Sequence, residues 1–310
     1  MKFAFLFPGQ GSQSVGMMQP FAESRAVRAV FDEASEALRQ DLWKLVAEGP
    51  AESLNATVNT QPVMLAAGYA VYRAWLEAGG AEPALVAGHS LGEYTALVAA
   101  GVIAFRDAVP LVRFRAEAMQ QAVPAGQGAM AAILGLEDEA VRAACGEAAQ
   151  GEVVEPVNFN APGQVVIAGH KAAVERCIAA AKARGAKRAV LLPVSAPFHS
   201  SLLAPAAERL AGYLARVDFQ APRVPVVNNV DVSVERDPAC IKDALARQAC
   251  NPVRWVEVVR HIAGTGVRHL AECGPGKVLS AFTRRIDERL QSHAISDPQS
   301  LEQALQALAA

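Results

Sequence analysis

The stretch LVAGHSLGEY, residues 85–94, decides the fold of the chain. Three apolar residues lead into Gly88-His89-Ser90-Leu91-Gly92, and the residues from 91 to 100 are good helix formers. The order strand, sharp turn, helix is the context of a Gly-X-Ser-X-Gly nucleophile elbow. The two glycines leave room in the crowded turn, and the amino end of a helix favours a developing anion. We therefore interpret Ser90 as a nucleophile rather than as part of an ordinary tight turn.

Length and composition favour an enzyme over a nucleic-acid-binding or membrane protein. The 310 residues are 52% hydrophobic and carry a formal net charge of -2. The absence of a basic bias speaks against nucleic acid, and the apolar residues 1–7 are too few for a signal peptide or a bilayer span. Five cysteines stand far apart without a C-x-x-C pair, which favours reduced thiols. We expect a cytoplasmic protein with no metal and no membrane contact.

A glycine-rich loop, PGQGSQ at residues 8–13, follows the first predicted strand at residues 2–7. It has no Walker lysine, and Ser14 stands where a dinucleotide motif needs its third glycine. Hydrolase-like α/β sites place one oxyanion amide in such a loop and the other on the residue after the nucleophile. On this interpretation the donors are the amides of Gln10 and Leu91; on the alternative the loop is a plain turn.

Arg115 falls on an apolar face of the helix predicted over residues 106–123. The stripe repeats at alternating four- and three-residue spacing and consists of Ala108, Val112, Arg115, Met119 and Ala122. An unpaired buried charge is very costly, so this guanidinium must meet an anion. The spacing leaves two alternatives open, a salt bridge to a buried Asp or Glu and a two-point grip on a substrate carboxylate.

The pattern changes after residue 125. Short strands and helices follow at residues 129–134, 137–148, 153–158, 164–168, 171–183 and 188–194. Their order, βαββαβ, is that of the ferredoxin-like unit. We predict a small inserted subdomain at residues 126–195, with residues 1–125 and 196–310 forming the core.

The chain returns to the core after Ser195 with Pro197-Phe198-His199-Ser200. This irregular segment lies where the two parts would meet, which is the usual place for a cleft. His89 adjoins Ser90, but neighbouring residues of an extended segment face opposite sides. Of the six histidines, His199 is therefore the predicted base for Ser90.

Strands and helices alternate through the rest of the chain. Helices are predicted at residues 25–40, 61–78, 241–249, 256–264 and 277–290, strands at 224–228 and 269–273, and a loop at 55–61. Such alternation indicates a parallel sheet covered on both faces. The predicted fold is α/β, a hydrolase-like parallel-sheet core with an inserted ferredoxin-like subdomain.

Many motifs in one order resemble the bacterial malonyl-CoA:acyl carrier protein transacylases over nearly the whole chain. They are FPGQGSQ, GHSLGEY, RAEAMQ, PVNFN, QVVIAG, PFHS, VPVVNNVD and GPGK. The resemblance implies transfer of a malonyl group from malonyl-CoA to the phosphopantetheine thiol of holo acyl carrier protein, for fatty acid synthesis and with no cofactor of the enzyme's own.

The resemblance also implies roles for individual residues. Ser90 would be acylated, with His199 as base and acid, Arg115 on the malonyl carboxylate, and Gln10 and Leu91 as oxyanion amides. Gln248 matches the position that orients the histidine, and no acidic triad member is implied. Phe198 resembles the bulky residue of the malonyl-selective branch, which would make methylmalonyl-CoA a poor substrate.

Other functions remain open from the residues alone. A serine thioesterase or esterase would use the same elbow, and Asp107 or Asp138 could complete its Ser, acid, His order. Arg115 on an apolar stripe disfavours neutral esters. A malonyl-transfer subunit of a malonate decarboxylase and a non-catalytic carrier-docking module are further alternatives.

Docking of an acidic carrier protein requires a basic surface. Two clusters are candidates: Lys182, Arg184, Lys187 and Arg188, and Lys277, Arg284 and Arg285. The sequence does not choose between them. We expect a monomer, because no long exposed apolar seam is evident.

Overall fold

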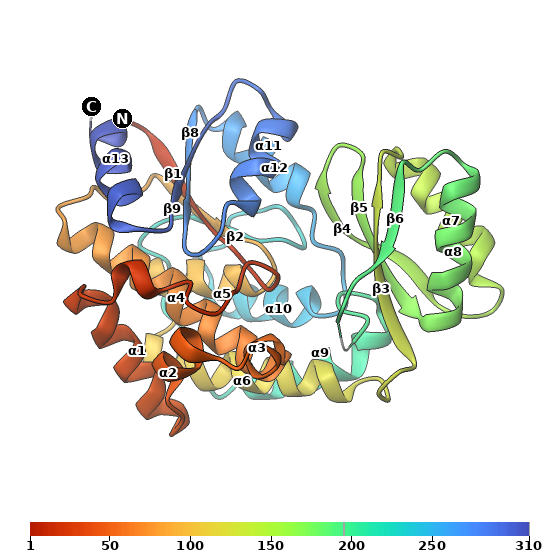
Figure 1. The fold of residues 1–310 in the computed structure, drawn as a ribbon, viewed down its shortest axis with the longest axis horizontal. Coiled ribbons are helices and arrows are strands. Elements are labelled where there is room, and N and C mark those ends of the chain that lie inside the picture. Colours follow the sequence, from red (N-terminus) through yellow and green to blue (C-terminus); the bar gives the residue numbers. More distant parts are fainter. Residues whose placement is uncertain (195, 310) are drawn as a thin grey trace.

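The computed structural model describes residues 1–194 and 196–309, which are organised by two separate sheets (Figure 1). A five-stranded sheet lies in the larger part of the molecule and a four-stranded sheet in the smaller part beside it. Both chain ends belong to the larger part. Ser195, at which the predicted insert ends, lies outside the described residues, so the division at residues 125 and 195 stays a prediction.

The larger sheet is parallel throughout, as the alternation predicted. Its order is β7-β2-β1-β8-β9, and every neighbouring pair is parallel. The strands are β1 Phe3–Phe7, β2 Leu85–Gly88, β7 Val226–Val227, β8 His269–Cys273 and β9 Gln291–Ile295. All residues of β1 and β2 are buried, because helices cover both sides of the sheet.

Alternate residues of β1 pack into two different apolar clusters. Phe3, Phe5 and Phe7 join helices α1, α4, α5 and α6, whereas Ala4 and Leu6 join α11 and α12. The helices of this part are α1 Arg25–Leu38, α2 Leu42–Glu48, α3 Ala51–Asn55, α4 Thr57–Glu77, α5 Leu91–Ala99, α6 Phe105–Gln121, α9 Ala204–Leu214, α10 Pro238–Gln248, α11 Trp255–Gly264, α12 Val278–Ile286 and α13 Pro298–Leu308, with short 3-10 turns at Gln19–Phe21 and Ser201–Leu203.

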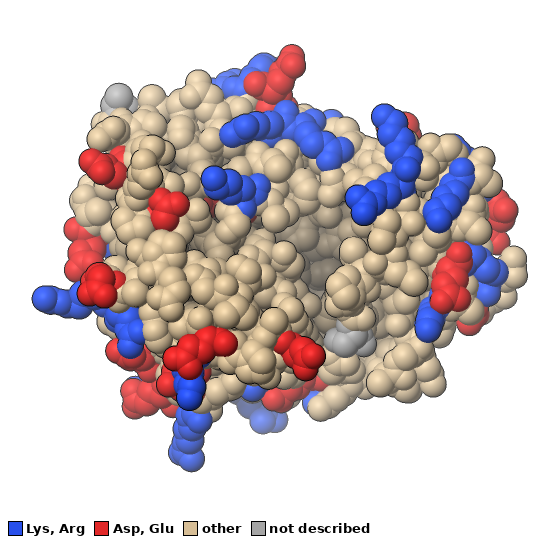
Figure 2. All heavy atoms as spheres, in the orientation of Figure 1, with Lys and Arg blue, Asp and Glu red and all other residues tan. Residues whose placement is uncertain are grey.

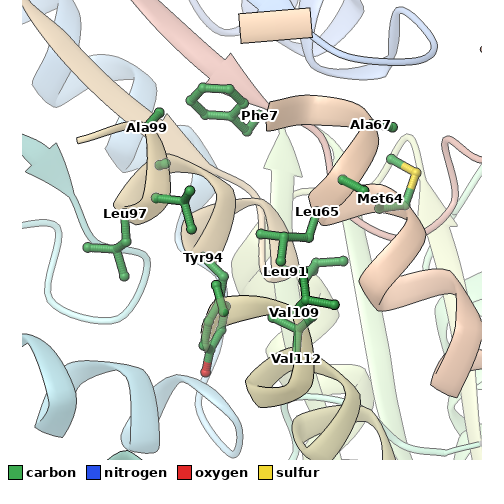
Figure 3. Close-up of a cluster of buried hydrophobic side chains, with 14 of the residues drawn as sticks. Phe7, Met64, Leu65, Ala67, Leu91, Tyr94, Leu97, Ala99, Val109 and Val112 are labelled. Atoms are coloured by element: carbon green, nitrogen blue, oxygen red, sulfur yellow. The ribbon is translucent and has the colours of Figure 1, made fainter. Parts of the chain in front are cut away.

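Helix α5, which follows the elbow, is held in the middle of the first cluster. All nine of its residues are buried. Figure 3 shows Leu91 and Tyr94 of this helix beside Leu65 of α4 and Val109 of α6, with Phe7 close by. Each large side chain buried in this way contributes about 1.5–3 kcal/mol. The packing therefore fixes the start of α5, and with it the position of the residue just before the helix.

The smaller sheet is antiparallel and has the order β4-β5-β3-β6. Its elements are β3 Gly128–Leu134, α7 Asp138–Ala149, β4 Val154–Ala161, β5 Gln164–His170, α8 Lys171–Ala183 and β6 Arg188–Leu191. Both helices pack against the sheet through an apolar cluster of their own. This order and pairing confirm the predicted ferredoxin-like unit.

A few elements differ from the prediction. Helix α4 begins at Thr57, so the loop predicted at residues 55–61 is wrong: Thr60 and Gln61 are polar but buried and hydrogen-bonded. The helix predicted to reach residue 290 ends at Ile286, and residues 291–295 form β9. Helices α2, α3 and α9 were not predicted. None of the helices in the described ranges has the length and apolar character needed to cross a bilayer.

Candidate active site

The elbow forms where β2 ends and α5 begins. Ser90 has φ +52° and ψ -108°, a conformation that L-residues rarely adopt. A Cβ on Gly88 would lie 1.9 Å from the backbone of Gly92, and one on Gly92 would lie 2.0 Å from the carbonyl oxygen of Phe7. Both glycines are therefore required by close backbone approach. The strand, turn and helix predicted around Ser90 are all present.

His199 is brought to Ser90 from 109 residues away in the sequence. Ser90 Oγ and His199 Nε2 are 2.7 Å apart, and His199 Nδ1 is 2.8 Å from the backbone carbonyl oxygen of Gln248. A carbonyl only accepts, so Nδ1 carries the proton and Nε2 accepts from the serine hydroxyl. Burial, followed by the positive charge of Arg115, lowers the pKa of His199 to about 3. The ring is thus a neutral base at physiological pH.

The position of a triad acid is taken by that backbone carbonyl. Asp107 and Asp138 lie in the first turns of α6 and α7, and within the described part of the chain neither bonds to His199. His89, predicted to point away from Ser90, hydrogen-bonds through Nε2 to Asn160 Oδ1 at 2.8 Å. In the described part of the site, Ser90 and His199 thus form a pair in which no carboxylate bonds to the histidine.

Arg115 is only 1% exposed and points its guanidinium at the nucleophile. Nη2 donates to Ser90 Oγ at 3.1 Å and to Gln248 Oε1 at 3.0 Å, and Nη1 donates to Gln61 Oε1 at 2.8 Å. All these acceptors are neutral. In residues 1–194 and 196–309 no Asp or Glu forms an ion pair with Arg115. Of the two alternatives for this residue, the salt bridge is therefore absent from the described residues.

Gln248 hydrogen-bonds to four residues of the site at once. Its carbonyl accepts from His199, its side-chain oxygen accepts from Arg115, and its Nε2 donates to the Ser90 carbonyl at 3.1 Å and to Glu93 Oε2 at 2.8 Å. Gln248 is fully buried at the end of α10. Its contact with the histidine is made by the backbone, which any residue could supply; only its contacts with Arg115, Ser90 and Glu93 need the amide side chain.

Gln10 and Leu91 both line the cavity in front of Ser90. Leu91 is the first residue of α5, where a helix leaves its amides without intrahelical partners. Among the described residues, no protein acceptor is hydrogen-bonded to the amide of Gln10 or of Leu91. The side chain of Gln10 is engaged elsewhere, since its Oε1 accepts from Thr57 Oγ1 at 2.7 Å. Both backbone N–H groups are free to bind an oxyanion.

The cavity has a volume of about 330 Å³ and is walled by both parts of the molecule. Phe198, 9% exposed and adjacent to His199, forms part of its wall together with Met119 and Met130. Apolar and polar side chains both line it, and two of the polar ones, Arg115 and His199, bond to Ser90 Oγ. No group of three or more metal-ligating side chains occurs in the described ranges. The arrangement suits acyl transfer to and from a serine hydroxyl with an acid-bearing acyl group.

Comparison with known proteins also indicates acyl transfer. The family described as "Acyl transferase domain" matches residues 4–295. The malonyl CoA-acyl carrier protein transacylase of Escherichia coli (strain K12) is 58% identical over 306 residues, which cover 98% of this chain and 99% of that protein. The chain belongs to this transacylase family. It is therefore an acyltransferase with the fold predicted from the sequence.

Solved structures of the transacylase family agree closely with this one. An acyl-carrier-protein S-malonyltransferase from Burkholderia pseudomallei 1710b is 67% identical with a TM-score of 0.98, and the match covers 99% of this chain and 100% of that one. A malonyl-transacylase solved in complex with a type II PKS acyl-carrier protein, PlMCAT:AntF, is 53% identical with a TM-score of 0.98, again over 99% and 100% of the two chains.

Asn229 and Glu93 are among the residues of this transacylase site that the sequence analysis missed. Asn229 and Glu93 are buried and hydrogen-bond to the elbow and to Gln248. Asn229 lies in the VPVVNNVD motif and Glu93 in GHSLGEY. The only available signal was their membership of these motifs, because an Asn after a strand and a Glu in a first helical turn are common for local reasons.

Proposed function

We propose that the chain transfers the malonyl group of malonyl-CoA to the phosphopantetheine thiol of an acyl carrier protein through a malonyl ester on Ser90. The observation that carries this proposal is Arg115, a buried guanidinium 3.1 Å from Ser90 Oγ whose hydrogen-bond acceptors among the described residues are all neutral. A substrate carboxylate would supply its missing anion, and guanidinium and carboxylate match in a two-point geometry. Malonyl thioesters place such a carboxylate two bonds from the reacting carbonyl.

The first half-reaction acylates the serine. His199 Nε2 removes the Ser90 proton as Oγ attacks the thioester carbonyl, and the amides of Gln10 and Leu91 stabilise the oxyanion. The imidazolium formed is held by the Gln248 carbonyl and returns its proton to the leaving CoA thiolate. Because burial and Arg115 disfavour the imidazolium, proton return is strongly driven.

The second half-reaction repeats these steps in reverse order. The carrier's phosphopantetheine thiol loses its proton to His199 and attacks the malonyl ester, and Ser90 leaves with that proton. The mechanism uses only groups of this chain and the two substrates, so we propose that it needs no metal and no cofactor. Parallel lines in initial-velocity plots are expected, and intersecting lines would contradict a covalent intermediate.

Intact-protein mass spectrometry tests the proposal directly. Brief mixing with malonyl-CoA should add one malonyl group to the protein, and holo acyl carrier protein should then remove it and gain the same mass. Ser90→Ala should abolish the adduct. Ser201→Ala, which removes an exposed hydroxyl bonded to Glu155, is the matched control and should leave the adduct unchanged.

Other outcomes identify the alternatives. An adduct lost to water equally fast with and without carrier would favour a thioesterase or esterase. Transfer to a malonate decarboxylase carrier but not to acyl carrier protein would favour that enzyme's malonyl-transfer subunit. Binding of carrier with no adduct from malonyl-CoA would favour a docking module.

For the carrier we propose the surface formed by Lys277, Arg284 and Arg285, all exposed. Lys277 precedes Val278, which lines the cavity, and Arg285 donates to Gln164, which also lines it. Figure 2 shows Lys and Arg side chains along the upper edge of the hollow and on the neighbouring face of the smaller part. A basic edge beside the cavity complements an acidic carrier.

Charge reversal distinguishes the two basic clusters. Lys277→Glu with Arg284→Glu should raise KM for the carrier while leaving acylation by malonyl-CoA unchanged. Lys182→Glu with Arg188→Glu, on the other cluster, is the control. A larger rise in KM for this second pair would move the docking surface to α8 and β6.

We further propose that the protein works in the cytoplasm as a monomer and as part of fatty acid synthesis. Its five cysteines are all free thiols, which suits a reducing compartment. We retain residues 1–125 and 196–310 as the core and 126–195 as the insert. Size-exclusion chromatography with light scattering tests the monomer, and limited proteolysis tests the boundaries.

A further inference from the structure

The backbone around Ser90 is held by a side chain outside the predicted catalytic set. Asn229 is fully buried and lies just after β7. Its Oδ1 accepts from the Ser90 amide at 2.7 Å, and its Nδ2 donates to the Gly88 carbonyl at 2.8 Å. One amide group thus bridges the peptide groups on the two sides of His89, at the point where the chain turns from strand to helix.

Asn229 is in turn held by Glu93, on the helix that starts at the elbow. A single carboxylate oxygen, Glu93 Oε2, accepts from the Asn229 backbone amide at 2.9 Å and from Gln248 Nε2 at 2.8 Å. Gln248 Nε2 also donates to the Ser90 carbonyl. The N–H of Ser90 therefore donates to the side chain of Asn229, and its C=O accepts from the side chain of Gln248. Glu93 accepts from both of these residues and so connects them.

We propose that Asn229 and Glu93 are positioning residues that aim the Ser90 hydroxyl at His199. The proposal rests on Ser90 being the nucleophile of the proposed function. A residue with positive φ keeps that conformation only where its surroundings over-determine it, and the two bonds of Asn229 do so here. The bridge needs one donor and one acceptor on the same side chain, which Asn supplies and Asp, Ala or Leu does not.

Loss of the bridge should act on the direction of Oγ. Without Asn229 the Ser90 N–H is a buried donor with no partner, and the residue is free to relax toward negative φ. That rotation moves Oγ away from His199 Nε2, now 2.7 Å away. A displacement of about 1 Å at a reacting atom is enough to lower a rate by roughly 100-fold.

Asn229→Ala and Asn228→Ala form a matched pair. Asn228 is the preceding residue, is 6% exposed, and also makes two side-chain hydrogen bonds, to Ser233 and to the Asp231 amide, but does not touch the elbow. The readouts are the thermal midpoint, the rate of Ser90 acylation by malonyl-CoA in rapid-quench mass spectrometry, and the rate of labelling by a fluorophosphonate, which has no carboxylate.

Asn229→Ala should slow both acylation and labelling by about 100-fold, with KM for malonyl-CoA little changed because Arg115 is retained. Asn228→Ala should stay within about threefold of the parent in both rates while losing a similar amount of thermal stability. Equal rate losses in the two variants, or a normal labelling rate in Asn229→Ala, would overturn the proposal and leave Asn229 a structural residue.

Glu93 gives a second comparison should Asn229→Ala not fold. Glu93→Gln keeps one carbonyl oxygen to accept from the Asn229 backbone amide and Gln248 Nε2, whereas Glu93→Met has no acceptor oxygen. Glu93→Gln should react at least about tenfold faster with the fluorophosphonate than Glu93→Met; equal rates would overturn the role of Glu93. Failure of malonyl-CoA to acylate the parent protein, with fluorophosphonate labelling intact, would refute the proposed function and leave this test valid.

Discussion

Arg115→Met is the substitution that most directly tests the proposed substrate. Methionine is unbranched and fills much of the same buried volume, but it leaves the malonyl carboxylate without a cation. Removing one partner of a buried ion pair costs about 3–5 kcal/mol. At 1.36 kcal/mol for each factor of ten, kcat/KM for malonyl-CoA should fall by roughly 10²- to 10⁴-fold. Acetyl-CoA, which has no distal carboxylate, provides the internal comparison.

The parent protein should use acetyl-CoA poorly, because that substrate leaves Arg115 buried without an anion. In Arg115→Met this penalty disappears, so kcat/KM for acetyl-CoA should rise while that for malonyl-CoA falls. Steady-state transfer to holo acyl carrier protein with each thioester measures both. An equal fall in kcat/KM for both substrates would refute the reasoning. It would indicate that Arg115 acts through its 3.1 Å hydrogen bond to Ser90 Oγ and not through the substrate carboxylate.

Three further predictions concern the surroundings of the site. Gly92→Ala, whose Cβ would lie 2.0 Å from the Phe7 carbonyl oxygen, should lower the free energy of unfolding in urea by more than about 3 kcal/mol. Gly146→Ala, at an open position toward the C-terminal end of α7, should raise it by up to about 0.5–1 kcal/mol. The pKa of His199 is about 3 in the folded protein and 6.5 in the unfolded chain, so below pH 6.5 protons bind preferentially to the unfolded chain and stability falls. Between pH 7 and 5 the free energy of unfolding of the parent should therefore fall by about 2 kcal/mol more than that of His199→Gln. Phe198→Ala should raise the methylmalonyl-CoA to malonyl-CoA ratio of kcat/KM by about tenfold, and an unchanged ratio would exclude crowding by Phe198.

The sequence predicted the fold best where one periodicity dominated. The apolar run of β1 and the stripe of α6 gave their elements directly, and the βαββαβ order identified the smaller part. The prediction of secondary structure failed where polar residues are buried, and where a segment has few apolar residues. Thr60 and Gln61 look like loop residues until their buried partners are known. Strand β9 is short and largely half-exposed, so its five residues have no alternating pattern to detect.

The structure brings together the serine, histidine and arginine predicted from the sequence, but it arranges them through contacts that no spacing reveals. Gln248 reaches His199 with a backbone carbonyl, which has no sequence signature beyond the motif itself. Asn229 bonds to Ser90 across 139 positions of sequence. Local patterns report which residues share a helix face or a turn; they carry no information on which two turns meet.

Among the described residues a backbone carbonyl, not a carboxylate, holds His199, and the neighbouring Arg115 gives a physical reason why this suits the site. Arg115 Nη2 and His199 Nε2 both contact Ser90 Oγ, so an acid placed to orient the imidazole would lie within reach of the guanidinium's field. Such an acid would partly neutralise the charge that meets the substrate carboxylate in the proposed function. A neutral carbonyl holds the ring and its tautomer equally well without this competition. The buried acid Glu93 instead accepts from Gln248, and burial raises its pKa to about 7, which limits its negative charge. In the proposed function this leaves the Arg115 charge available for the carboxylate of the acyl group.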